Sequence, residues 1–106
     1  TDDMRDSSSL IMIPKLSKKG ALIKYFDPTG FKNELSKIKN VSYANSVKKS
    51  LEGADLVIIH TEWNDFKSIN FRNLVKGKKF IIYDMRNIYS PTKIRGQGFK
   101  YYSVGR

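Results

Sequence analysis

The residues of this 106-residue sequence that could do chemistry are polar groups that directly follow apolar segments. Asp27 follows the first such segment, His60 and Glu62 follow the second, and Asp84 and Arg86 follow the third. If these segments are parallel strands of one sheet, the polar groups meet at its carboxyl edge, where open α/β folds bind ligands. An arginine there can hold a phosphate with two parallel hydrogen bonds, so Arg86 is the first candidate for ligand binding. The alternative is a salt bridge from Arg86 to Asp84 or Glu62.

His60 is the sole histidine, and the sequence has no cysteine, which excludes a thiolate zinc site and a cysteine nucleophile within the chain. Glu62 and Asp65 lie close to it, but a metal site needs more ligands than this cluster offers. A serine triad would need a serine on a nucleophile elbow, whereas the serines at residues 7–9 are typical helix caps. We therefore expect no catalytic residue and no metal site, and a structural or peripheral role for His60.

Phosphate-binding loops are also missing from the sequence. Gly96 and Gly98 lack the third glycine and the strand-to-helix context of a dinucleotide fingerprint, so a turn before the last strand is expected there. Arg5 precedes the amino terminus of a predicted helix, another position where anions bind readily.

The elements that must position these groups follow from the apolar pattern. Buried strands are predicted at residues 22–26, 55–59 and 80–83, and the last two are nearly continuous apolar runs, typical of parallel strands covered on both faces. A further strand is predicted at residues 101–104 and a short edge strand at residues 41–43.

Helices are predicted between these strands. The first begins at a serine among residues 7–9 and runs to about Lys19, with Gly20 as its stop and Pro14, which should bend it, inside. Core-facing apolar stripes predict three more: Phe31, Leu35 and Ile38; Val47 and Leu51; and Phe71, Leu74 and Val75. Alternating strands and helices predict an α/β fold with a mainly parallel sheet, in a single domain over residues 1–106.

The chain carries 20 basic and 10 acidic residues, a formal charge of +10. Fifteen of the basic residues are lysines scattered from Lys15 to Lys100, which is typical of a solvated surface rather than of a nucleic-acid interface. No apolar run approaches the roughly 20 residues of a membrane-spanning helix, and no signal pattern opens the sequence. We expect a cytoplasmic protein that binds neither membrane nor nucleic acid and that accommodates an anionic ligand.

Five segments, taken in order, resemble the carboxy-terminal, UDP-binding domain of the UDP-glucose 6-dehydrogenases, in the UDP-glucose/GDP-mannose dehydrogenase family. They are residues 1–7 (Thr-Asp-Asp-Met-Arg-Asp-Ser), 25–28 (Tyr-Phe-Asp-Pro), 54–66 (with Thr-Glu-Trp at 61–63), 84–89 (Asp-Met-Arg-Asn-Ile-Tyr) and 98–106. The resemblance covers nearly the whole chain.

The resemblance implies a larger enzyme that oxidises the C6 alcohol of UDP-glucose to a carboxylate in two steps, with two NAD⁺. Such enzymes bind NAD mainly in an amino-terminal Rossmann domain, and a central helix, through which we expect the parent to form a homo-oligomer, leads to the UDP-binding domain. The catalytic cysteine lies in segments upstream of this chain, which we therefore expect to be inactive alone. By the family's motifs, Arg5 would contact the NAD cofactor and Arg86 the UDP-sugar.

The resemblance also carries departures. Met85 stands where the family usually has glycine, which could alter how the backbone approaches the ligand. In a Rossmann-like, three-layer fold the first strand is central, and in this family it precedes Thr1, as does a substrate-binding lysine segment. The strands at residues 22–26 and 55–59 would then flank the position of a strand that this fragment lacks. We expect the sheet to be interrupted there.

Three alternatives remain open. The chain could belong to a GDP-mannose dehydrogenase or to a UDP-N-acetylmannosamine dehydrogenase, although the Thr-Glu-Trp segment and Arg86-Asn87 favour UDP-glucose. It could also be a stand-alone basic module that binds nucleic acid, in which case its binding would fall steeply with salt.

Overall fold

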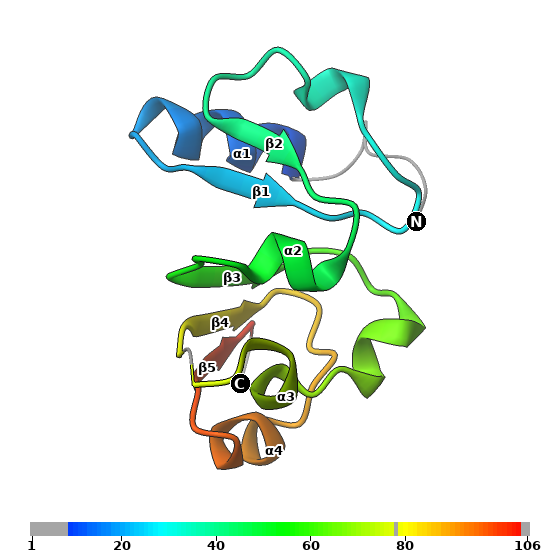
Figure 1. Cartoon of the computed structure of the whole chain (residues 1–106), viewed down its shortest axis with the longest axis vertical. Helices are drawn as coiled ribbons and strands as arrows, with labels where there is room; N and C mark the ends of the chain where they lie inside the picture. Colours follow the sequence, from blue (N-terminus) through cyan, green and yellow to red (C-terminus); the bar gives the residue numbers. More distant parts are fainter. Residues whose placement is uncertain (1–8, 78, 105–106) are drawn as a thin grey trace. The chain divides into compact units, whose positions relative to one another are not determined.

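The computed structural model describes residues 9–77 and 79–104, which form two compact units that divide between Ser50 and Leu51. The elements are, in order, α1 (Ser9–Lys18), β1 (Ile23–Tyr25), η2 (Asn33–Leu35), β2 (Val41–Tyr43), α2 (Val47–Leu51), β3 (Leu56–Ile59), η3 (Asn64–Ser68), α3 (Phe71–Val75), β4 (Ile81–Asp84), α4 (Pro91–Gly96) and β5 (Lys100–Ser103) (Figure 1). None of the helices in the described ranges is long and apolar enough to cross a membrane.

The first unit contains α1 and the parallel pair β1–β2, in which Ile23 lies opposite Val41 and Tyr25 opposite Tyr43 (Figure 1). The predicted first helix and both strands are therefore confirmed. Gly20 ends α1 as predicted, with φ of +93°, a left-handed conformation that glycine adopts without steric cost.

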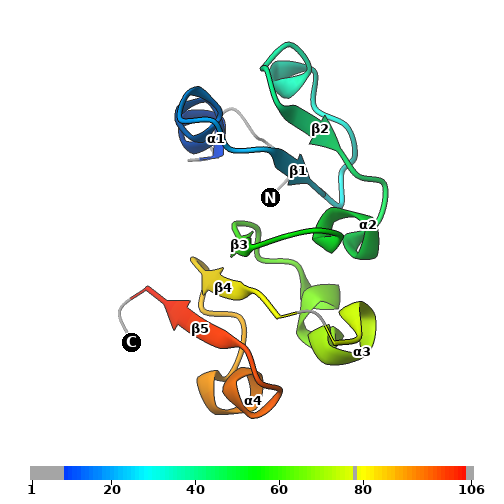
Figure 2. The same ribbon diagram turned by 60° about the vertical axis from the view of Figure 1, so that its left-hand side comes forward.

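The second unit is a three-stranded parallel sheet in the order β3–β4–β5. Helices α3 and α4 lie on the same side of this sheet (Figures 1 and 2). The covered side is an aromatic core, where Phe71 of α3 makes edge-to-face contacts with Phe80 and Tyr89, and Phe80 stacks on Phe99 with 4.9 Å between ring centroids.

The prediction that the strands at residues 55–59 and 80–83 are buried on both faces is wrong. Exposure alternates along β4, where Ile82 and Asp84 are buried while Ile81 and Tyr83 are exposed. Leu56, at the start of β3, is also half-exposed. The helices of this unit cover one face, so the apolar residues of the other face remain in contact with solvent.

Two further predictions need correction. Only η2, a single 3₁₀ turn, forms within residues 31–38, where the apolar spacing predicted a longer helix. Leu35 is buried as expected, but Phe31 is exposed and makes an edge-to-face contact with Tyr43. Conversely, α4 is a helix that the sequence analysis did not predict. Ser90 caps it by accepting the amide hydrogen of Lys93, and Pro91 is its first residue, which together are a standard signature of a helix start.

The described strands form two separate parallel sheets, β1–β2 and β3–β4–β5. β1 and β3 each have one neighbour, and no described strand joins them. The interruption expected between the strands at residues 22–26 and 55–59 stays a prediction. The parallel α/β architecture with Rossmann-like character is confirmed.

Candidate functional site

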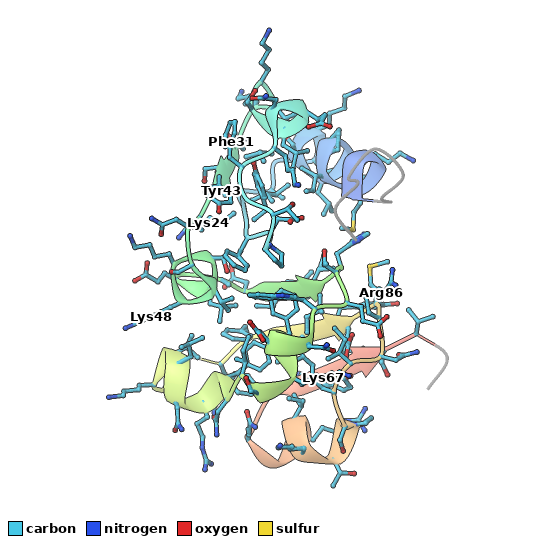
Figure 3. The ribbon with its side chains drawn as sticks, turned by 90° about the vertical axis from the view of Figure 1, so that its right-hand side faces the viewer. Lys24, Phe31, Tyr43, Lys48, Lys67 and Arg86 are labelled. Carbon is cyan, nitrogen blue, oxygen red and sulfur yellow. The ribbon has the colours of Figure 1, made fainter. Side chains whose placement is uncertain are left out.

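The carboxyl edge of the β3–β4–β5 sheet carries the polar groups that the sequence predicted for it. His60 and Glu62 follow β3, and Arg86 follows β4, whose register places Ile59 beside Asp84. Figure 3 shows the Arg86 side chain at this end of the sheet. Asp27, the third predicted member, belongs to the first unit and is described with it below.

Arg86 forms the ion pair that was the alternative to ligand binding, but with one of the two proposed partners only. Its Nη2 lies 3.5 Å from Oε1 of Glu62, and the two side chains are 48% and 58% exposed. An exposed pair at this distance is weak, because water competes with both charges. The guanidinium is therefore accessible to an anion in solution.

Asp84 interacts with the backbone of the following loop rather than with the guanidinium. Its carboxylate is fully buried, and Oδ1 accepts the amide hydrogen of Arg86 at 3.0 Å. Oδ2 accepts the amide hydrogens of Ile88 at 2.7 Å and Tyr89 at 3.0 Å, and the hydroxyl hydrogen of Tyr101 at 2.7 Å. A buried carboxylate with this many donors is well compensated, and it fixes the loop that carries Arg86.

Tyr89 connects this loop to the segment that follows β3. Its ring is buried against Phe71, and its hydroxyl donates a hydrogen bond to the carbonyl oxygen of Phe66, in η3. Burial raises the pKa of the Tyr89 hydroxyl, with the neighbouring Asp84 as the second cause, so the hydroxyl stays a donor at any physiological pH. The sequence analysis did not single out Tyr89 or Tyr101 as hydrogen-bonding residues. A tyrosine at a core position, where an apolar side chain would suffice, was the signal that its hydroxyl has a buried partner.

Met85 is the residue at which the resemblance implied a glycine, and its φ is not positive, so the backbone at this position does not require glycine. Among the described residues other than glycine, only Asn40 and Asn87 have positive φ, the latter at 55°. The left-handed turn of this loop therefore falls on Asn87, and asparagine adopts this conformation more readily than most residues. The Met85 amide donates to the carbonyl oxygen of Ile59 at 3.0 Å, which ties the start of the loop to β3.

Burial and the positive charge of Arg86 both affect the pKa of His60. Partial burial lowers the pKa of His60 from the ordinary value of 6.5, and the positive charge of Arg86 lowers it further. The lowered pKa favours the neutral imidazole. The described residues contain no group of three or more potential metal ligands around it.

In the first unit, Asp27 shapes a turn after β1. Its Oδ1 accepts hydrogen bonds from the amide of Thr29 at 2.8 Å and from the Thr29 hydroxyl at 2.6 Å, and it lies 3.8 Å from the ammonium of Lys32. This is an Asx-type turn, in which the carboxylate satisfies the local backbone.

Two other predicted features remain, Arg5 and the glycine pair at residues 96 and 98. Arg5 lies outside the described residues. Gly96 ends α4 and Gly98, with φ of +96°, leads into β5, so this glycine pair joins a helix to a strand, as the predicted turn requires. A dinucleotide-binding turn runs in the opposite order, from strand to helix. The glycine pair at residues 96 and 98 is therefore not a dinucleotide-binding turn.

Comparisons with known proteins agree with the resemblance read from the sequence. Residues 1–91 match the UDP-binding domain of the UDP-glucose/GDP-mannose dehydrogenase family. The chain is 36% identical over 107 residues to a UDP-glucose 6-dehydrogenase of Rhizobium meliloti, 37% identical over 110 residues to that of Rickettsia prowazekii, and 31% identical over 110 residues to UDP-glucose 6-dehydrogenase YwqF of Bacillus subtilis.

These alignments cover 99–100% of the chain but only 24–25% of each relative. The chain thus spans about a quarter of the length of the curated relatives it matches. The family match covers most of the chain and includes the β3 and β4 loops with Glu62 and Arg86. The chain therefore belongs to the UDP-glucose/GDP-mannose dehydrogenase family, and the part matched, residues 1–91, is the family's UDP-binding domain.

Proposed function

We propose that this chain binds UDP-glucose as the carboxy-terminal domain of an NAD-dependent UDP-glucose 6-dehydrogenase, with Arg86 holding the diphosphate. The observation that carries the proposal is the placement of Arg86. Its guanidinium is half-exposed at the carboxyl edge of a parallel sheet, and the backbone of its loop is hydrogen-bonded to the buried carboxylate of Asp84. Open α/β sheets bind ligands at this edge, and a planar, permanent cation suits a diphosphate.

The relatives favour UDP-glucose over other nucleotide sugars, since those compared with this chain are named UDP-glucose 6-dehydrogenases. The family description includes GDP-mannose as well, so the nucleotide is the property to test. Calorimetric titration of the complete protein with UDP and with GDP gives this test. We expect UDP to bind and GDP to bind at least tenfold more weakly. Preference for GDP would move the protein to the GDP-mannose branch.

Other parts of the proposal concern the complete protein. We assign the oxidation of UDP-glucose to UDP-glucuronate to the complete enzyme and not to this chain, which has no cysteine nucleophile. NAD would supply the hydride acceptor when bound. We assign the contact of this domain with NAD to Arg5, on the family's Thr-Asp-Asp-x-Arg motif alone. A cytoplasmic homo-oligomer is the form in which we propose that the enzyme works.

A further inference from the structure

Two loops at the carboxyl edge of the second unit share one buried hydrogen-bond network. The first loop follows β3 and carries Glu62, and the second follows β4 and carries Arg86. Both charged side chains are more than 40% exposed, so neither has its position fixed by its own packing. Whatever sets the position of Arg86 must therefore act through the backbone.

The network begins at the fully buried carboxylate of Asp84. Three amides of the second loop donate to it, those of Arg86, Ile88 and Tyr89. The Tyr101 hydroxyl donates to it from β5 at 2.7 Å and lies 3.2 Å from the carbonyl oxygen of Tyr89. Both carboxylate oxygens thus act as acceptors, and the Tyr101 hydroxyl of β5 lies beside both Asp84 and the backbone of Tyr89.

Tyr89 extends the network to the first loop. Its hydroxyl donates to the carbonyl oxygen of Phe66, the same oxygen that accepts the amide hydrogen of Ile69. The amide of Phe66 in turn donates to the carbonyl oxygen of Trp63 at 3.0 Å, immediately after Glu62. A displacement of Tyr89 would therefore move the backbone on which Glu62 sits as well as the one on which Arg86 sits.

We infer that Asp84, Tyr89 and Tyr101 are positioning residues for the nucleotide site, because they hold the Arg86 loop and the Glu62 loop in one fixed relation. This inference rests on the proposed binding of UDP at Arg86. A buried charge contributes little net stability, since the loss of its hydration offsets most of its interactions. It does, however, impose one loop geometry, because only that geometry satisfies all of its donors.

The test is a set of double-mutant cycles with Arg86, read as UDP affinity of the complete protein by calorimetry. Tyr89→Phe removes the hydrogen bond to Phe66 and keeps the ring. Asp84→Asn replaces one acceptor oxygen with an amide nitrogen that faces donors. Tyr102→Phe is the matched control, because Tyr102 neighbours Tyr101 in the same strand and its side chain is exposed.

We expect Tyr89→Phe to weaken UDP binding about threefold to tenfold, the range for one hydrogen bond, and Asp84→Asn to weaken it more. In the Arg86→Ala background each substitution should weaken binding less than about twofold, because the residue it positions is gone. Tyr102→Phe should leave the affinity unchanged in both backgrounds. Thermal unfolding of each variant shows whether it is folded, and if Asp84→Asn does not fold, Tyr89→Phe decides the question alone.

The outcomes separate this inference from the proposed function. If Arg86→Ala weakens UDP binding but Tyr89→Phe weakens it by the same factor in both backgrounds, or not at all, the positioning role is overturned and the Arg86 site stands. If Arg86→Ala leaves UDP affinity unchanged, the proposed site itself is overturned, and the positioning role falls with it.

Discussion

The guanidinium of Arg86 lies 3.5 Å from the carboxylate of Glu62, across the edge at which β3 and β4 end. Each side chain comes from a different loop, so the pair depends on the register of two neighbouring strands and not on local sequence. In this arrangement the Glu62 carboxylate pairs with the guanidinium that the proposed diphosphate would bind, so the two anions compete for Arg86.

Glu62→Gln should therefore strengthen UDP binding. The variant removes the carboxylate that competes for Arg86 and keeps the size of the side chain. An exposed ion pair contributes about 0.2–1 kcal/mol, so affinity should rise by at most about fivefold. Calorimetry with UDP at low and high salt checks this, with Asp65→Gln as the charge-matched control. Weaker binding in Glu62→Gln would mean that Glu62 contacts the ligand directly.

The stability of the protein should fall as the pH drops below about 6.5, in part because of His60. Burial and the charge of Arg86 lower the folded-state pKa of His60 below its ordinary 6.5. Between the two values the unfolded chain binds a proton that the folded chain does not, so acid favours unfolding; above 6.5 both states are neutral and the effect vanishes. Urea unfolding at pH 7.5 and pH 5.5 should show a smaller loss in His60→Gln than in the wild type. Equal losses would contradict the lowered pKa.

Phe71→Ala should destabilise the protein by about 3–5 kcal/mol, the cost of removing a buried aromatic ring. Phe71 is 2% exposed and contacts three other rings of the second unit, those of Phe80, Tyr89 and Phe99. Phe31→Ala is the matched control: Phe31 is 55% exposed, and we expect it to cost less than about 1 kcal/mol. Chemical denaturation measures both, and similar costs would contradict the assignment of the core.

The contrast between these two phenylalanines shows where sequence reasoning succeeds. Phe71 begins a compact segment between two clear strands, and its burial was predicted. Phe31 has the same helical spacing to Leu35, but the carboxylate of Asp27 and the hydroxyl of Tyr25 bond the amides of Thr29 and Lys32 in a tight turn. Side-chain to backbone bonds of this kind compete with helix formation, and apolar periodicity does not report them.

The site shows the same division. The placement of Arg86 and Glu62 at one edge of the sheet could be predicted, because polar residues after apolar strands identify the edge of a parallel sheet. The hydrogen bonds that join Asp84, Tyr89 and Tyr101 could not be predicted, since they depend on which backbone amides a buried carboxylate faces. That geometry arises only when β4 and β5 pair, with Asp84 opposite Ser103.

The outer edge of β3 gives a test of the interrupted sheet. The bonds from Ile81 to Asp55 and from Met85 to Ile59 show that odd-numbered residues of β3 face β4, so the amides of Leu56 and Ile58 point away from it. In the 106-residue chain these two amides should exchange their hydrogens faster than those of Val57 and Ile59.

Hydrogen exchange followed by NMR checks this edge. In the complete protein, where we expect a strand from the preceding segment to pair with β3, the amides of Leu56 and Ile58 should become protected. If they exchange as fast in the complete protein as in the 106-residue chain, the expected central strand does not pair with β3.

Arg86→Ala in the complete protein tests the central claim most directly. Removing the guanidinium should weaken UDP-glucose binding by about 1.5–3 kcal/mol, the range for a hydrogen bond to a charged group, which is roughly tenfold to 150-fold in affinity. NAD affinity should barely change, whereas Arg5→Ala should show the opposite pattern. Arg72→Ala, which removes an exposed arginine of α3, is the control for net charge. Calorimetry of UDP-glucose binding should show the predicted loss for Arg86→Ala and wild-type affinity for Arg72→Ala. Equal affinity in the wild type and Arg86→Ala would make Arg86 a surface residue paired with Glu62 and contradict the proposed site.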